Sequence, residues 1–110
     1  LKSQSMPAKA ALIARLNDTS ADVKIAAAEA LSYLNAEEKA LAELMLQLTH
    51  PSAMVRIHAA NVIDAIGRKA KPVAKELQIM VNSMQQLKKV GKLPDENYLL
   101  TALSHTVSKL

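Results

Sequence analysis

The feature that most constrains this chain is an internal repeat with a period of 32 residues. Residues 8–35 read AKAALIARLNDTSADVKIAAAEALSYLN, and residues 40–67 read ALAELMLQLTHPSAMVRIHAANVIDAIG. The two segments align without a gap and are identical at ten of 28 positions, a number that frequent alanine raises somewhat. Self-similarity at a period of roughly 20 to 50 residues predicts stacked copies of one small unit.

Each repeat has the pattern of two amphipathic helices joined by a short turn. Leu12 and Leu16, like their counterparts Leu44 and Leu48, stand four residues apart, which places them on one helix face. The turns NDTS and THPS follow, and Ser20 is expected to cap the next helix. The residues expected to face inward on the second helices are Val23, Ile25, Ala27, Ala28, Leu31 and Leu34, then Val55, Ala59, Val62, Ile63 and Ile66.

Other residues mark the helix boundaries. Pro7 is expected at the first helical position, where its missing N–H costs nothing. Asn35 is expected to cap the next unit, with Glu38 as its capping-box partner. Gly67 is expected to supply a left-handed stop at the end of the second repeat.

A third unit departs from the first two. Pro72 is expected to open a long helix that runs to about Val90, with a stop at Gly91 and a restart at Pro94. In the closing helix the residues near one face are Leu99, Leu103, Thr106 and Leu110. An atypical last unit suits a repeat array, because its outer face meets water and not another repeat.

The sequence therefore predicts an all-α fold, a short right-handed α-solenoid of about three helix pairs. One domain is expected over residues 1–110, with units at about 5–35, 36–67 and 70–110. Half of the residues are hydrophobic but only 2% are aromatic, so Ala, Leu, Ile, Val and Met must build the core. Four methionines are expected to fill gaps in that core: Met45, Met54, Met80 and Met84.

The segments DVKIAAAEALSYL and MVRIHAANVIDAIG resemble the HEAT and HEAT-like repeat family. They match its pattern D-x(4)-V-[KR]-x-A-A-x-A-L-x-x-L closely, and the resemblance covers essentially the whole chain. It implies an alpha-alpha superhelix, armadillo-like in architecture, whose helix layers can form a groove for a partner peptide or helix.

A narrower resemblance links the chain to the C-terminal helical extension of some bacterial sulfatases. In those proteins a HEAT-like pair is followed by a G-x-K-A-x-P connector, a long helix and a closing helix that starts with Tyr-Val. Tyr98 matches the closing helix, whereas Leu99 departs from the expected Val. The connector matches at Gly67, Lys69, Ala70 and Pro72. This resemblance implies the C-terminal part of a larger sulfatase-like hydrolase, in the periplasm or outside the cell.

No residue is expected to be catalytic or to bind a cofactor. The chain lacks cysteine, a glycine-rich loop and the C/S-x-P-x-R motif of sulfatases. His50, His58 and His105 have neither H-x-x-x-H nor H-E-x-x-H spacing, so a metal site is not expected. Two carboxylate pairs are expected to stabilise first helical turns: Glu37 with Glu38, and Asp95 with Glu96.

The basic residues suggest a possible interaction surface. Lys24 and Arg56 are counterparts early in the second helices, where a cation opposes the helix dipole. A carboxylate from Asp18 or Asp22 is expected to offset this, unless the aliphatic stems simply pack while the charges reach water. The candidate surface comprises Lys24, Arg56, His58, Arg68, Lys69, Lys71 and Lys75. A second basic cluster contains Lys88, Lys89 and Lys92.

These observations favour a non-catalytic repeat domain that contacts protein, either its own upstream catalytic domain or another protein. The first methionine is Met6, so a mature form, a trimmed chain or an excised fragment is expected. The first alternative is a free-standing protein-binding scaffold. A second is a weak nucleic-acid binder, suggested by the net charge of +4 but disfavoured because the basic clusters are short and lack aromatic residues. Membrane contact is not expected, because no apolar run is long enough to span a bilayer.

Overall fold

The computed structural model describes residues 2–34, 37–92 and 97–110. These residues form α-helices and one 3₁₀ helix, with no β-strand among them. The elements are α1 (Lys2–Arg15), α2 (Ala21–Tyr33), α3 (Glu37–Gln47), α4 (Ala53–Ile66), the 3₁₀ helix η1 (Gly67–Val73), α5 (Ala74–Lys89) and α6 (Asn97–Ser108). The all-α prediction is confirmed.

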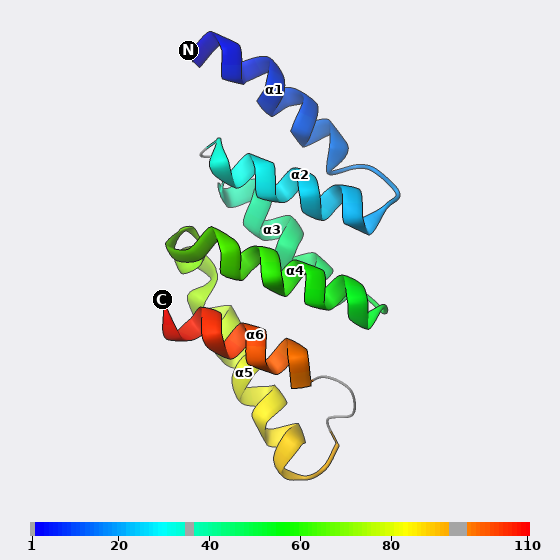
Figure 1. The fold of residues 1–110 in the computed structure, drawn as a ribbon, viewed down its shortest axis with the longest axis vertical. Helices are drawn as coiled ribbons and strands as arrows, with labels where there is room; N and C mark the ends of the chain where they lie inside the picture. Colours follow the sequence, from blue (N-terminus) through cyan, green and yellow to red (C-terminus); the bar gives the residue numbers. More distant parts are fainter. Residues whose placement is uncertain (1, 35–36, 93–96) are drawn as a thin grey trace.

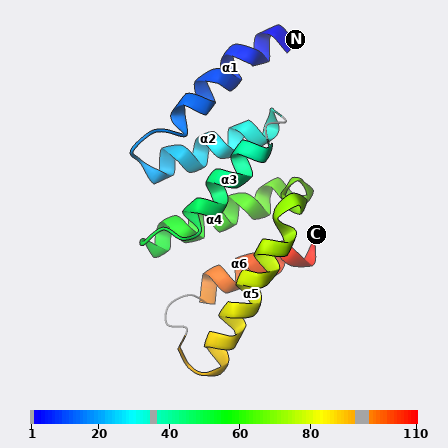
Figure 2. The ribbon, with the colours of Figure 1, turned by 180° about the vertical axis from the view of Figure 1, so that it is seen from behind.

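The helices are arranged as an elongated stack of pairs, 53 × 29 × 16 Å in extent. The second helices of the pairs, α2, α4 and α6, lie side by side in one layer (Figure 1), and α4 contacts both of its neighbours there. Helices α3 and α5 lie behind this layer, as the reverse view shows (Figure 2). Between them, η1 contacts α3, α4 and α5. The predicted short helical-repeat solenoid is therefore confirmed.

The core follows the predicted pattern because the apolar positions repeat at helical spacing. Ala28, Ala59 and Ala60 are fully buried, and their small side chains let neighbouring helices approach closely. Val23, Leu34 and Val55 are only half-buried. Fully buried larger residues come from each of the helices that follow α1: Ile25, Leu31, Leu44, Ile63, Leu77 and Leu103.

The first helix is less buried than its counterpart in the second repeat. Leu44 in α3 and Leu48 directly after it are 0% and 2% exposed, whereas Leu12 and Leu16 remain half-buried. Helix α1 lies at one end of the stack (Figure 1) and packs mainly on α2. An end helix lacks a neighbour on one side, so the same sequence pattern buries less surface there.

The helix starts depend on the two turns. Ser20 caps α2 as predicted, because its side-chain oxygen accepts the backbone N–H of Val23 at 3.4 Å. The expectation for Pro7 is wrong, since α1 already begins at Lys2 and includes Pro7 in its interior. Asn35 and its proposed cap lie outside the described residues, and α3 begins at Glu37.

The connector after α4 differs from the prediction. Pro72 does not open the long helix but lies within η1, and α5 begins at Ala74. Gly67 ends α4 with φ 61° and ψ −128°. Its φ is positive as expected, but this ψ is not that of a left-handed helical residue, so the chain turns sharply into η1. Ala70, in the middle of η1, is fully buried.

The end of α5 agrees closely with the sequence. The helix ends at Lys89, and Gly91 has φ +69°. The Gly91 N–H donates to the Lys88 carbonyl and the Lys92 N–H to the Leu87 carbonyl, which is the Schellman arrangement. The expected restart at Pro94 lies outside the described residues, and α6 begins at Asn97.

Candidate interaction surfaces

Arg56 is held by the turn that precedes its own helix. Its Nη1 donates to the His50 carbonyl at 2.6 Å and to the Pro51 carbonyl at 3.0 Å. These carbonyl oxygens supply the negative partial charge that offsets a cation in the first turn of α4. The sequence suggested a carboxylate for this role, and the structure shows that backbone carbonyls contribute to it.

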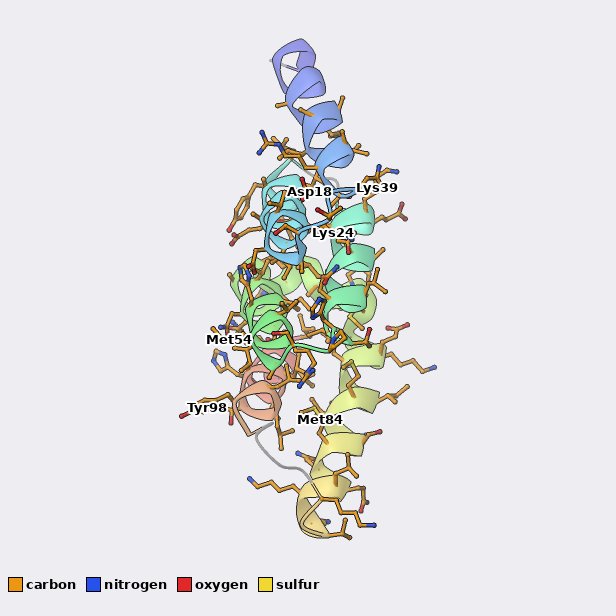
Figure 3. All side chains as sticks on the ribbon, turned by 90° about the vertical axis from the view of Figure 1, so that its right-hand side faces the viewer. Asp18, Lys24, Lys39, Met54, Met84 and Tyr98 are labelled. Atoms are coloured by element: carbon orange, nitrogen blue, oxygen red, sulfur yellow. The ribbon has the colours of Figure 1, made fainter. Side chains whose placement is uncertain are left out.

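Asp18 and Asp22 are engaged elsewhere than at Lys24. Asp18 Oδ1 accepts the backbone N–H of Ser20 at 2.8 Å. Asp22 Oδ1 lies 3.0 Å from Nδ1 of His58. Lys24 is half-buried near the same turn (Figure 3), and within the described residues it forms no hydrogen bond or ion pair with either carboxylate. Of the two expected explanations, an ion pair with Asp18 or Asp22 and packing of the aliphatic stem, the half-buried Lys24 side chain fits the second.

The three histidines have two structural roles. His50 Nδ1 accepts the backbone N–H of Ser52 at 2.9 Å, as Asp18 does for Ser20 one repeat earlier. His58 pairs with Asp22 and so links α4 to α2. His105 Nδ1 lies 3.0 Å from Asp64 and links α6 to α4. Two histidine–carboxylate pairs therefore bridge successive helices of the front layer.

Asp64 in α4 contacts three side chains from the end of the chain, and sequence inspection did not single it out. Its Oδ1 accepts a hydrogen bond from the buried hydroxyl of Thr106 at 2.9 Å and lies 3.0 Å from Lys109 Nζ. Partial burial raises the pKa of Asp64, but hydrogen bonds from Lys109, Thr106 and His105 outweigh that effect and hold the pKa below its usual value.

The predicted surface falls into two groups. Lys24 and Arg56 lie near the N-terminal ends of α2 and α4, beside the turns at one edge of the stack. The basic residues of the connector lie past the opposite end of α4, a helix roughly 20 Å long at 1.5 Å per residue. Lys69 is half-buried there, and its Nζ donates to the Ser32 carbonyl at 2.8 Å near the end of α2. The exposed members of this second group are Arg68, Lys71 and Lys75.

The methionines are placed unequally. Met84 is buried between α5 and α6 (Figure 3), and Met45 and Met80 pack against the core. Met54 is 80% exposed on α4, so the expectation that it fills a core gap is wrong. Tyr98 near the start of α6 is also exposed, and both side chains point away from the stack (Figure 3).

Among the hollows lined by described residues, two lie between α-helices toward opposite ends of the stack. A cleft of about 430 Å³ lies between α1 and α3. Its lining residues are Ile13, Leu16, Asn17, Lys39, Ala42, Glu43 and Leu46. A cleft of about 820 Å³ lies between α5 and α6. Its lining residues are Gln85, Lys88, Lys89, Leu100, Thr101 and Ser104.

Neither cleft was singled out from the sequence, although a signal was present for the second. Lys88 follows Leu77, Val81 and Met84 at spacings of four, three and four residues, which is the pattern of one helix face. A lysine at the next position of an apolar stripe indicates that the stripe reaches solvent there, beside the cleft.

Neither a metal cluster nor a membrane span is found among the residues that the structure describes. Over 2–34, 37–92 and 97–110, no three His, Asp or Glu side chains gather in a group that would hold a metal ion. In the same residues no helix is both long enough and apolar enough to cross a bilayer.

Comparison with known proteins adds one finding. A family model described as HEAT repeats matches residues 10–86, which is more than half of the chain. The match includes α2 to α4 and η1 in full, most of α5 and the C-terminal part of α1. Searches of curated proteins and of solved structures find no match.

Proposed function

Because the chain belongs to the HEAT-repeat family, we propose that it is a non-catalytic scaffold that binds segments of other proteins. In repeat stacks each unit buries its apolar face against its neighbours, and the remaining helix surfaces are available to partners. The observation that carries the proposal is the pair of open clefts between α1 and α3 and between α5 and α6. Grooves between helices are where such proteins accept an extended or helical segment.

The α1–α3 cleft has walls of the kind that an amphipathic segment needs. Ile13 and Leu16 contribute half-buried apolar surface, and Leu46 beside them is 61% exposed. Lys39 and Glu43 stand on the same lining and offer one charge of each sign. Apolar walls with charges beside them favour a protein segment over a small polar metabolite.

A non-catalytic role agrees with the placement of the histidines. The constellations nearest to acid–base chemistry are the pairs His58–Asp22 and His105–Asp64. Each pair bridges two helices, and neither lines either cleft. Their positions support a role in joining neighbouring units.

A library of random 12-residue peptides displayed on phage tests the proposal without a known partner. We expect selection on the immobilised chain to yield peptides that bind in solution with dissociation constants below about 100 µM, a level typical of weak peptide recognition. Leu46→Asp should abolish binding of the peptides that use the α1–α3 cleft, and Lys88→Glu should abolish binding of those that use the α5–α6 cleft. A library that yields no binder for the folded chain would contradict the scaffold function.

The sulfatase setting stays a prediction. Besides Tyr98, four connector residues carry that resemblance, and each has a structural role here: Gly67 turns the chain, Lys69 bonds to α2, Ala70 is buried and Pro72 lies in η1. Any chain with this connector would favour such residues, so the motif supports the shared fold more than a shared hydrolase. The reading frame upstream of the codon for Leu1 decides the matter, because a sulfatase parent requires an α/β domain with a C/S-x-P-x-R motif there.

A further inference from the structure

The core-facing stripe of α5 ends in a lysine. Leu77 and Val81 are buried against the core, and Met84 is at its margin. One helical step later, Lys88 continues the same stripe but is exposed and lines the α5–α6 cleft. The position that would have extended the core therefore presents an ammonium group to an open hollow.

The opposite wall of this cleft comes from α6. Leu100 is buried and forms an apolar part of the lining, while Thr101 and Ser104 contribute hydroxyl groups. Gln85 adds a side-chain amide from α5. We call this lining, Gln85, Lys88, Lys89, Leu100, Thr101 and Ser104, the basic cleft.

The described lining of the basic cleft has charge of one sign. Lys88 and Lys89 are its charged residues, and Lys89 also borders an adjoining hollow of about 380 Å³ along α5. Lys92 lies three residues further on, and its backbone N–H donates to the Leu87 carbonyl. The carboxylate of α5 nearest in sequence, Glu76, lies in the first turn at the far end of the helix.

We propose that the basic cleft binds an acidic segment of a partner protein. This inference rests on the scaffold function proposed above and names its partner class. Carboxylates would pair with Lys88 and Lys89, the hydroxyls and amide would accept further polar contacts, and an apolar side chain would pack on Leu100. A volume of about 820 Å³ lies within the range of well-formed ligand sites and accommodates a few side chains.

A peptide fits this cleft better than a nucleic acid does. None of the six lining residues is aromatic, so bases have no surface on which to stack. Two lysines neutralise few phosphates, whereas the buried Leu100 offers apolar surface that a phosphate backbone cannot use. This charge balance refers to the described lining residues, which do not include residues 93–96.

The test is a fluorescence-anisotropy titration with a labelled 12-residue peptide of repeating Glu-Leu-Asp-Glu. Its neutral counterpart carries Gln and Asn at the acidic positions, and a 12-nucleotide single-stranded DNA serves as the third probe. We expect the acidic peptide to bind, with a loss of at least about tenfold in the double variant Lys88→Glu, Lys89→Glu. The double variant Lys88→Arg, Lys89→Arg should bind within about threefold of the parent, because it keeps both positive charges.

The chain offers a matched control for net charge. Lys71→Glu with Lys75→Glu makes the same change in charge at exposed residues near the other end of α5. This control should leave the affinity within about twofold, since these residues do not line the cleft. All variants replace exposed side chains, and thermal unfolding followed by circular dichroism checks that they fold.

Three results would overturn the proposal. They are equal losses in the Lys88/Lys89 variant and the Lys71/Lys75 control, equal binding of the neutral peptide, and tighter binding of the DNA. The titrations are repeated in the variant Asp95→Asn, Glu96→Gln, which removes the two carboxylates that stand between α5 and α6 in the sequence. Absence of acidic-peptide binding both with and without these two substitutions would also overturn the proposal. If the random library yields binders but none of them is both acidic and dependent on Lys88, this inference fails while the scaffold function stands.

Discussion

The Asp64 carboxylate in α4 accepts a hydrogen bond from the buried hydroxyl of Thr106 in α6, with 2.9 Å between the two oxygens. The same carboxylate lies 3.0 Å from Lys109 Nζ and from His105 Nδ1. Three side chains of the last helix region thus converge on one acid of the preceding unit. Asp64 therefore joins the atypical third unit to the regular repeats.

Acid should weaken this junction. The folded-state pKa of Asp64 is lowered, so its contribution to stability is present above the unfolded pKa of about 4 and is lost as pH falls through the folded value. We expect the free energy of unfolding, measured with urea, to fall more steeply between pH 5 and pH 3 in the parent than in Asp64→Asn. Parallel pH profiles for the two proteins would contradict this role for Asp64.

At neutral pH the junction is tested by truncation. Asp64→Ala should destabilise the chain by about 1–3 kcal/mol, because it removes a charge-assisted hydrogen-bond acceptor and leaves Lys109 without this partner. Glu29→Ala provides a matched control, since its carboxylate makes only a long contact of 3.4 Å with the exposed Tyr33. The control should change stability by less than about 0.5 kcal/mol.

His50 and Asp18 perform the same task in successive turns, so an aspartate should replace the histidine. His50→Asp should retain or slightly raise stability, because a carboxylate can accept the Ser52 N–H and also favours the N-terminus of α4. His50→Ala should lower stability by about 1 kcal/mol, since Ser52 itself provides no side-chain cap. Thermal unfolding of the three proteins distinguishes these outcomes, and an equal loss in both variants would refute the equivalence.

Equivalent leucines should differ in their contribution to stability. Leu44→Ala in α3 should cost about 2–5 kcal/mol, because the side chain is fully buried. Leu12→Ala, at the equivalent position one repeat earlier, should cost about 1 kcal/mol, because the Leu12 side chain is only half-buried. Urea unfolding measures both, and similar losses would show that a further element covers α1 in solution.

The repeat pattern was sufficient to predict the fold and most of the core. Helix periodicity is a local property, so residues such as Leu44, Ile63 and Leu77 could be assigned to the interior from spacing alone. The stops at Gly67 and Gly91 were also visible, because both need a positive φ. The lower burial at the end of the stack could not be predicted from the sequence, since Leu12 and Leu44 have the same sequence pattern but different neighbours.

The contacts between units lay beyond sequence reasoning. Asp22 meets His58 and Asp64 meets His105 because of how far one helix slides along the next, and no local pattern encodes that offset. The prediction that Pro72 opens the long helix was wrong for a different reason. Proline suits the first turn of an α-helix and also the 3₁₀ turn in which Pro72 lies. The basic cleft could have been predicted, because Lys88 stands in an apolar stripe.

The two glycines should respond differently to substitution. An added Cβ meets no atom within 4 Å at either position, so the cost of alanine comes from the backbone alone. At Gly91, in a Schellman turn, Ala should cost about 1 kcal/mol and Asn less, because Asn tolerates the left-handed conformation. At Gly67, with φ 61° and ψ −128°, both Ala and Asn should cost about 2 kcal/mol or more, since essentially only glycine adopts this region. Thermal unfolding of the four variants measures these costs. If Asn were better tolerated than Ala at Gly67 to the same degree as at Gly91, the result would contradict the backbone conformation described for the end of α4.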